Sequence, residues 1–155
     1  MFRDITTLLK DPAAFAAAID RTYEHYRNVH VDKVVGIESR GFVLGAPLAY
    51  RLKAGFVPAR KPGKLPAAAT RETYSLEYGT DAVEIHNDAI AAGDRILLHD
   101  DLLATGGTMR ATARLVERLG GTIVGYSFLI ELAFLKGRAA LGNEEVFSLL
   151  TYDSE

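Results

Sequence analysis

Short apolar runs alternate along the chain with longer alanine-rich or amphipathic segments. Four runs of aliphatic and β-branched residues predict buried strands, at residues 33–37, 55–59, 95–98 and 122–130. The segments between and before them predict three helices, over residues 13–27, 41–52 and 108–119. The tail predicts a short helical stretch and a last strand near residues 146–150. This alternation predicts an α/β fold: a mostly parallel, twisted sheet flanked by helices on both faces.

Capping and turn residues sharpen these boundaries. Asp11 followed by Pro12 predicts the start of the first helix, because Asp can cap it and Pro has no N–H to satisfy there. Two prolines and a glycine predict a loop over residues 61–69. The runs 73–78 and 82–86 flank Gly79 and predict a hairpin, so residues 61–86 form a flexible loop and a flap.

Composition narrows the class of protein. A chain of 155 residues with 48% hydrophobic and 25% charged residues predicts one globular domain, spanning residues 1–155. Eighteen basic and 20 acidic side chains give a net charge of −2, which disfavours a general nucleic-acid binder. With no cysteine there is no disulfide, thiolate metal site or cysteine nucleophile. No secretory signal or membrane span is recognisable, so we expect a soluble, cytoplasmic protein without a membrane partner.

The most informative segment runs from residue 96 to residue 108. It predicts a strand, then Asp100 and Asp101, then a small-residue loop, then a helix N-terminus. The loop's backbone N–H groups, the hydroxyls of Thr105 and Thr108 and the helix dipole together form an anion cradle. The two acids would repel a phosphate but accept hydrogen bonds from a sugar diol. Together these features indicate a site for a ribose 5-phosphate; the alternative is a capped helix after a glycine turn.

This segment resembles the phosphoribosyl-pyrophosphate (PRPP) signature of the type I phosphoribosyltransferases. Its form, Asp-Asp-Leu-Leu-Ala-Thr-Gly-Gly-Thr, resembles that of the adenine-specific branch. Further motifs match that branch in order and spacing, and the resemblance covers essentially the whole chain. They are Phe-Arg-Asp-Ile at 2–5, Glu-Ser-Arg-Gly-Phe at 38–42, Arg-Lys-Pro-Gly-Lys-Leu-Pro at 60–66, Tyr-Ser-Leu-Glu-Tyr-Gly at 74–79, and Glu131 followed by Leu-Lys-Gly-Arg at 135–138.

The resemblance implies an activity. A phosphoribosyltransferase of this branch transfers the 5-phosphoribosyl group of PRPP to adenine and yields AMP and pyrophosphate in purine salvage. It implies Mg²⁺ bound mainly through PRPP or pyrophosphate, a homodimer, and a type I phosphoribosyltransferase fold with a flap and a short N-terminal hood, here partial over residues 1–10. Two alternatives remain open: a transferase for a 6-oxopurine, and a non-catalytic PRPP- or nucleotide-binding regulator.

The resemblance also implies roles for individual residues. Asp100 and Asp101 would hold the ribose hydroxyls, and the 5-phosphate would bind at Ala104, Thr105, Gly106, Gly107 and Thr108. The pyrophosphate would bind at Glu38, Ser39, Arg40, Arg60, Lys61 and Lys64, with Lys64 acting across a dimer interface. We expect a cis peptide bond between Glu38 and Ser39. For the basic side chains of residues 51–64, the alternative is a solvated basic face.

Base recognition and proton transfer are implied for the flap and the N-terminus. Glu77, in a predicted strand between Tyr74 and Tyr78, would meet the purine near N7 and pass a proton; the alternative is a solvent-facing strand residue. Phe2 and Arg3 would cover the adenine, and the alternative is a frayed terminus. His99 is expected to be a tolerated strand residue; the alternative is that it tunes the neighbouring acids. The other three histidines have no metal-ligand spacing.

Overall fold

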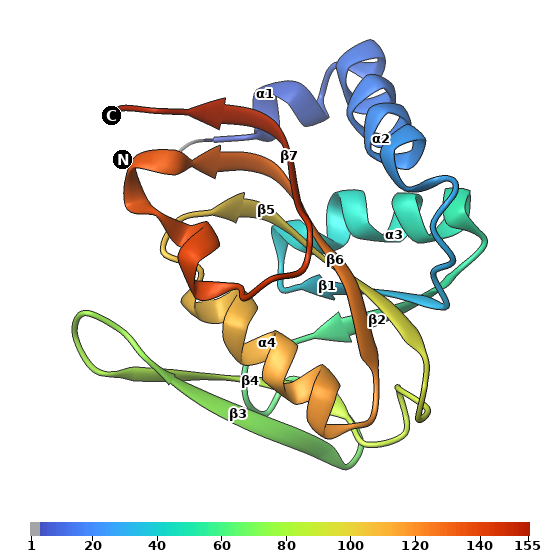
Figure 1. Ribbon diagram of the computed structural model, residues 1–155, viewed down its shortest axis with the longest axis vertical. Helices are drawn as coiled ribbons and strands as arrows, with labels where there is room; N and C mark the ends of the chain where they lie inside the picture. The colour runs from blue at the N-terminus through green and yellow to red at the C-terminus, as the bar shows by residue number, and fades with distance from the viewer. Residues whose placement is uncertain (1–3) are drawn as a thin grey trace.

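A five-stranded sheet forms the centre of the molecule in a computed structural model that describes residues 4–155. All its neighbouring strands run parallel, in the order β2-β1-β5-β6-β7 (Figure 1). The five strands are β1 (Lys33–Ile37), β2 (Gly55–Ala59), β5 (Arg95–Leu103), β6 (Thr122–Leu132) and β7 (Val146–Tyr152). The predicted parallel sheet is confirmed.

Helices cover both faces of this sheet. α2 and α3 lie on one face, and α4 lies on the other together with an antiparallel hairpin of β3 and β4 (Figure 1). The helices are α1 (Thr6–Leu9), α2 (Pro12–Tyr26), α3 (Arg40–Leu52) and α4 (Gly107–Arg118), with short 3-10 turns η1 (Ala133–Leu135) and η2 (Gly137–Ala140). The hairpin strands are β3 (Ala69–Ser75) and β4 (Thr80–His86). The α/β fold class predicted from the alternation is therefore confirmed.

Two-residue alternation along the central strands fills both layers of the core. Val34 of β1 and Leu97 of β5 pack with Tyr26 of α2 and Leu48 of α3. Their sequence neighbours Val35 and Leu98 pack on the opposite face with α4 residues such as Leu115 and Val116. Parallel strands buried on both faces need apolar residues at nearly every position, which is why short unbroken apolar runs predicted them.

Three differences from the predicted elements have a clear physical reason. β5 continues to Leu103, five residues beyond the predicted end, because residues 100–103 pair with β6. β3 begins at Ala69, within the predicted loop, because Ala69 pairs with His86. The short α1 was not predicted; its start is fixed by the Asp4 carboxylate, which accepts a hydrogen bond of 2.9 Å from the Thr6 N–H. In all three places the deciding interaction is a pairing or cap that apolar periodicity does not report.

Within residues 4–155, no helix combines the length and the apolar character that crossing a membrane requires.

Candidate active site

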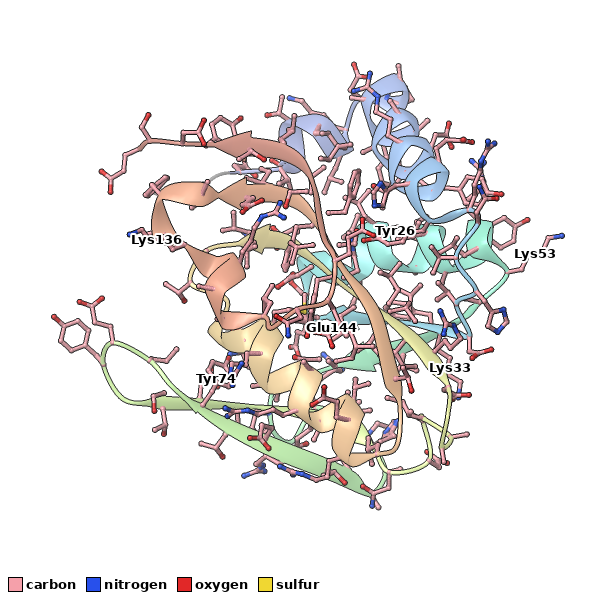
Figure 2. The ribbon with its side chains drawn as sticks, viewed as in Figure 1. Tyr26, Lys33, Lys53, Tyr74, Lys136 and Glu144 are labelled. Carbon is pink, nitrogen blue, oxygen red and sulfur yellow. The ribbon has the colours of Figure 1, made fainter. Side chains whose placement is uncertain are left out.

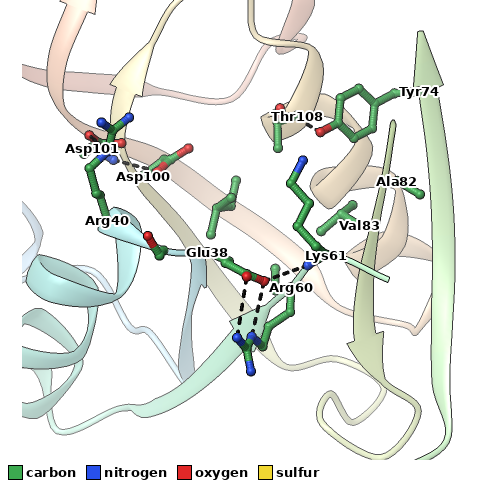
Figure 3. Close-up of a pocket in the computed structure, with 13 residues that line it drawn as sticks. Glu38, Arg40, Arg60, Lys61, Tyr74, Ala82, Val83, Asp100, Asp101 and Thr108 are labelled. Carbon is green, nitrogen blue, oxygen red and sulfur yellow. Dashed lines mark hydrogen bonds and ion pairs between the residues drawn. The ribbon is translucent and has the colours of Figure 1, made fainter. Parts of the chain in front are cut away.

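A cavity of about 370 Å³ opens at the carboxyl ends of β1, β2 and β5 (Figure 3). This is the edge at which open parallel sheets bind ligands. Residues from the start of α3, the start of α4 and the β3–β4 hairpin complete its wall. The lining residues are Ile37, Glu38, Ser39, Arg40, Ala59, Arg60, Lys61, Tyr74, Ala82, Val83, Asp100, Asp101 and Thr108. The fold thus brings together residues that are up to 71 positions apart in sequence (108 − 37).

Glu38, which follows β1, connects to the basic residues Arg60 and Lys61, which follow β2. Its carboxylate accepts hydrogen bonds from the Arg60 Nε at 3.2 Å and from the Lys61 backbone N–H at 2.8 Å (Figure 3). Burial opposes the charge, but these donors outweigh it and hold the pKa of Glu38 below its ordinary value. The peptide bond between Glu38 and Ser39 is cis, as predicted. Glu38 therefore fixes the ends of β1 and β2 relative to each other.

The paired acids lie within β5 rather than after it. The Arg40 Nε lies 2.8 Å from the Asp101 Oδ2, and the Asp101 backbone N–H donates to the Asp100 Oδ1 at 2.8 Å. Burial, followed by the negative charge of Asp101, raises the pKa of Asp100 well above its ordinary value. The prediction that the strand ends before these acids is wrong, because pairing with β6 extends it. Because Asp100 and Asp101 belong to a paired strand, the backbone holds their carboxylates in fixed positions.

A series of polar contacts connects the β3–β4 hairpin to Thr108 at the start of α4 and to Lys61 after β2. The Thr108 hydroxyl donates to the Tyr74 hydroxyl at 3.2 Å, and Tyr74 donates to the Asp81 Oδ2 at 3.3 Å. Asp81 also pairs with the Lys61 ammonium, whose hydrogen bond lowers the pKa of Asp81 and raises that of Lys61. The sequence reasoning did not single out Asp81. The signal was available, because Tyr74 and Asp81 face each other in the register of the predicted hairpin.

The small-residue loop adjoins the main cavity. Its five residues, 104–108, line a second cavity of about 90 Å³ that shares Asp100 and Thr108 with the first. Gly106 has φ +84°, a left-handed conformation that glycine adopts without strain, and it precedes the first residue of α4. No side chain of the N-cap residue caps this helix start, so the first backbone N–H groups of α4 lack that partner, and residues 106–108 line the second cavity. The loop predicted to be an anion cradle therefore lies at a helix N-terminus and lines a cavity.

Among the described residues, three predicted site residues line neither cavity: Lys64, Glu77 and Tyr78. Glu77 and Tyr78 lie in the exposed turn between β3 and β4, so the prediction of a strand at Glu77 is wrong. Lys64 contributes its carbonyl oxygen as an acceptor for Arg60, at 3.3 Å. Phe2 and Arg3 lie outside the described residues.

Two further basic residues of the 51–64 run serve elsewhere. Arg51 pairs with Asp20 and stacks 4.2 Å above the ring of Tyr23, so it ties α3 to α2. Lys53 lies at the far end of α3 from the cavity (Figure 2). The run is therefore divided: its second half, at Arg60 and Lys61, reaches the cavity, and its first half does not.

Comparison with known proteins gives the family. The model of the phosphoribosyl transferase domain matches residues 4–141. The adenine phosphoribosyltransferase of Solibacter usitatus is 60% identical over 153 residues, which are 99% of this chain and 88% of that protein. The chain belongs to the adenine phosphoribosyltransferase family. The match is not restricted to the loop of residues 104–108, because it extends through nearly all helices and strands.

Solved structures of the family agree with this fold. The enzyme of Thermoanaerobacter pseudethanolicus is 51% identical with a TM-score of 0.95, covering 97% of this chain and 88% of that chain. The enzyme of Saccharomyces cerevisiae, solved in complex with adenine and an imino-altritol bisphosphate, is 44% identical with a TM-score of 0.89. That match covers 96% of this chain and 86% of the yeast chain. The type I phosphoribosyltransferase fold predicted for this chain is thereby confirmed.

His99 is a buried residue of β5, directly before the two acids. It is 2% exposed, its Nδ1 lies 3.2 Å from the Ser127 Oγ, and its Nε2 finds no hydrogen-bond partner among the described residues. Burial lowers the pKa of His99 to about 4, so the ring is neutral at pH 7. A neutral ring at this place adds no positive charge beside Asp100.

We expect His99 to make stability depend on pH. In the unfolded chain its ordinary pKa is 6.5, whereas the folded value is about 4. The unfolded state therefore binds more protons between these values, and the free energy of unfolding should fall by about 2 kcal/mol between pH 7 and pH 5. Urea unfolding at both pH values measures this, with the His99→Leu variant as control. The prediction fails if the variant loses as much stability as the unchanged protein.

Proposed function

We propose that this chain transfers the 5-phosphoribosyl group of PRPP to adenine, releasing AMP and pyrophosphate. The observation that carries the proposal is the arrangement at the sheet edge: an uncapped helix N-terminus, two acids and a group of cations around connected cavities. Membership of the family supports the same reaction, as does the adenine bound in the yeast relative. Each part of PRPP then has a chemically matched partner.

The 5-phosphate is assigned to the loop of residues 104–108. Ala104, Thr105, Gly106 and Gly107 offer backbone N–H groups at the start of α4, and the partial positive charge of a helix N-terminus stabilises a phosphate. On phosphate binding, the Thr108 hydroxyl would exchange its bond to Tyr74 for one to the phosphate. Tyr74 would thereby be released from the loop.

The ribose is assigned to Asp100 and Asp101. Carboxylates accept hydrogen bonds from the 2- and 3-hydroxyls, and their negative charge stabilises the positive charge that develops on the ring as the bond to pyrophosphate breaks. Because both acids are mounted on β5, they need no reorganisation during the reaction.

The pyrophosphate is assigned to the cis-peptide loop and the basic loop. Arg40, Arg60 and Lys61 supply positive charge, and Lys64 lies close in sequence to extend it. Ser39 offers a hydroxyl at the start of α3. Glu38 cannot accept an anion itself, so its proposed part is to hold Arg60 and Lys61 in place through the hydrogen bonds described above.

Adenine is assigned to the flap and the N-terminal segment. The imidazole ring of the base loses one proton as N9 bonds to the sugar, and the carboxylate of Glu77 would accept it. Glu77 is exposed in the turn, so the flap must close over the bound base for this transfer. Tyr78 would close with it and exclude water, and Phe2 and Arg3 would cover the other side of the base.

Magnesium fits this site as a companion of the substrate. Among residues 4–155, no three His, Asp or Glu side chains gather as a metal site of the protein's own. Mg²⁺ usually keeps several waters and binds through substrate phosphates plus one or two carboxylates, and Asp100 and Asp101 are the carboxylates within reach of the sugar. When bound, Mg²⁺ would offset the charge of the departing pyrophosphate. The homodimer and the cytoplasmic location stay predictions.

A base panel tests the proposed function. The purified chain is incubated with Mg²⁺, PRPP and, separately, adenine, hypoxanthine, guanine and xanthine, and nucleotide formation is followed. We expect AMP from adenine and no product from the other bases, because a 6-amino group donates a hydrogen bond where a 6-oxo group accepts one. Product from an oxopurine would overturn the base assignment. Binding of PRPP without any product, also in an N-terminally extended chain, would favour the regulator.

A further inference from the structure

We propose that an ion pair behind the active site, Glu131–Arg138, positions the 5-phosphate loop and thereby sets the affinity for PRPP. The proposal rests on the proposed function and adds a positioning pair to it. Neither side chain lines the two cavities described above. The pair would act on the loop through Gly137, the residue next to Arg138.

Gly137 packs against the loop backbone with no side chain in between. A Cβ atom on Gly137 would lie 2.3 Å from the Ala104 carbonyl oxygen and 2.8 Å from the Leu103 Cδ1. From the other side, a Cβ on Gly106 would lie 2.7 Å from the Gly137 carbonyl oxygen. All three distances are too short for any real Cβ contact. The backbone of η2 is therefore the surface on which the loop of residues 104–108 rests, and a shift of η2 must move the loop.

The ion pair fixes η2 to two strands of the sheet. The Arg138 Nε and Nη2 each donate to a different oxygen of the Glu131 carboxylate, both at 2.7 Å, and the Nη1 donates to the Val146 carbonyl at 2.9 Å. Glu131 is 3% exposed and pairs with Leu103 in the register of β6 with β5. One guanidinium thus joins β6, η2 and β7 at the level where β5 enters the loop.

The geometry of this pair suits positioning. A bidentate guanidinium–carboxylate contact fixes the relative orientation of the two side chains as well as the distance between them, which a lysine ammonium could not do. The hydrogen bond from Arg138 lowers the pKa of Glu131 against its burial, so the carboxylate stays charged. The N-terminal end of α4 is held to the same turn, because the Arg110 Nη1 donates to the Ala140 carbonyl at 2.7 Å. The loop of residues 104–108 and the N-terminal end of α4 therefore both depend on the position of η2.

The test compares Glu131→Gln with a matched control, Asp94→Asn. Each change replaces a carboxylate by its amide in a half-buried or buried ion pair. The control pair is Lys33–Asp94, with 2.7 Å between Nζ and Oδ2. Figure 2 shows Lys33 at the end of the strands opposite the active site, far from Lys136, which directly precedes η2. Initial rates are measured against PRPP and against adenine, PRPP binding is measured by calorimetry without adenine, and Tm is recorded for each variant.

We expect Glu131→Gln to raise KM and the dissociation constant for PRPP about 10-fold, with kcat and KM for adenine changed less than about twofold. Asp94→Asn should lower Tm and leave both PRPP constants unchanged. Arg138→Lys, which keeps a positive charge beside the buried carboxylate, should fall between Glu131→Gln and the unchanged protein, and it serves if Glu131→Gln does not fold.

Two results overturn the proposal in distinguishable ways. If the unchanged protein is active while Glu131→Gln and Arg138→Lys lower only Tm, the pair is structural and does not position the loop. If the unchanged protein neither binds PRPP nor forms AMP, the proposed function fails and this proposal fails with it.

Discussion

Replacing both acids, as Asp100→Asn with Asp101→Asn, is expected to lower kcat by about 100-fold or more, because preorganised charge at the reacting centre is lost. The double variant should still fold. Burial and Asp101 already raise the pKa of Asp100, so removing the two charges relieves an unfavourable contact. The Arg40 side chain, which loses its ion pair with Asp101, is 37% exposed, so water can solvate it.

Single-turnover rates with saturating PRPP and adenine, together with Tm, measure this effect. The single variants separate the two acids: Asp101→Asn also removes the Arg40–Asp101 ion pair, whereas Asp100→Asn leaves that ion pair in place. Full activity in the double variant would refute the assignment of these acids to the ribose. If the double variant loses activity because its Tm falls below the assay temperature, the two acids serve stability instead.

Glu77→Gln is expected to slow the chemical step by about 10²–10⁴ if the carboxylate accepts the proton of the base. Glutamine has the same size and can still donate or accept hydrogen bonds, but it does not take up a proton. Because Glu77 lies in an exposed turn, the substitution removes no packing, and KM for PRPP and Tm should stay near those of the unchanged protein.

A second acid of the same hairpin supplies the control. Glu72 on β3 pairs with Arg118 of α4 and so anchors the hairpin to the helix. Glu72→Gln should loosen the flap without removing the proton acceptor, and its single-turnover rate should stay near normal. An unchanged rate in Glu77→Gln, or an equal loss in Glu72→Gln, would mean that Glu77 acts only through the position of the flap.

Much of the fold could be predicted because its signals are local. Apolar runs marked the core strands, and the Asp11 cap at the start of α2 is confirmed by its 2.8 Å bond from the Ala14 N–H. The extension of β5 could not be predicted, because residues such as Asp100 have low strand propensity and join the strand only through pairing with Phe128 of β6. Long-range pairing overrode local preference there.

The candidate site shows the same division. The resemblance named many of the residues around the cavity, and the fold brings Glu38, Arg60 and Asp100 together in its lining. What the sequence could not predict is which carboxylate holds which cation. The Arg40–Asp101 pair joins residues 61 positions apart (101 − 40), and such a pairing follows only once the order of strands β1 and β5 is known.

The pairing of cations with carboxylates in the cavity has a consequence for selectivity among anions. Arg40, Arg60 and Lys61 are each held by an acid of the chain: Asp101, Glu38 and Asp81. On the proposed roles, an incoming anion must compete with a carboxylate already in place. Chloride, with one diffuse charge, competes poorly, whereas a pyrophosphate group presents several oxygens and charges at once. On the proposed roles, the resting protein would therefore bind a multivalent anion such as PRPP in preference to monovalent anions.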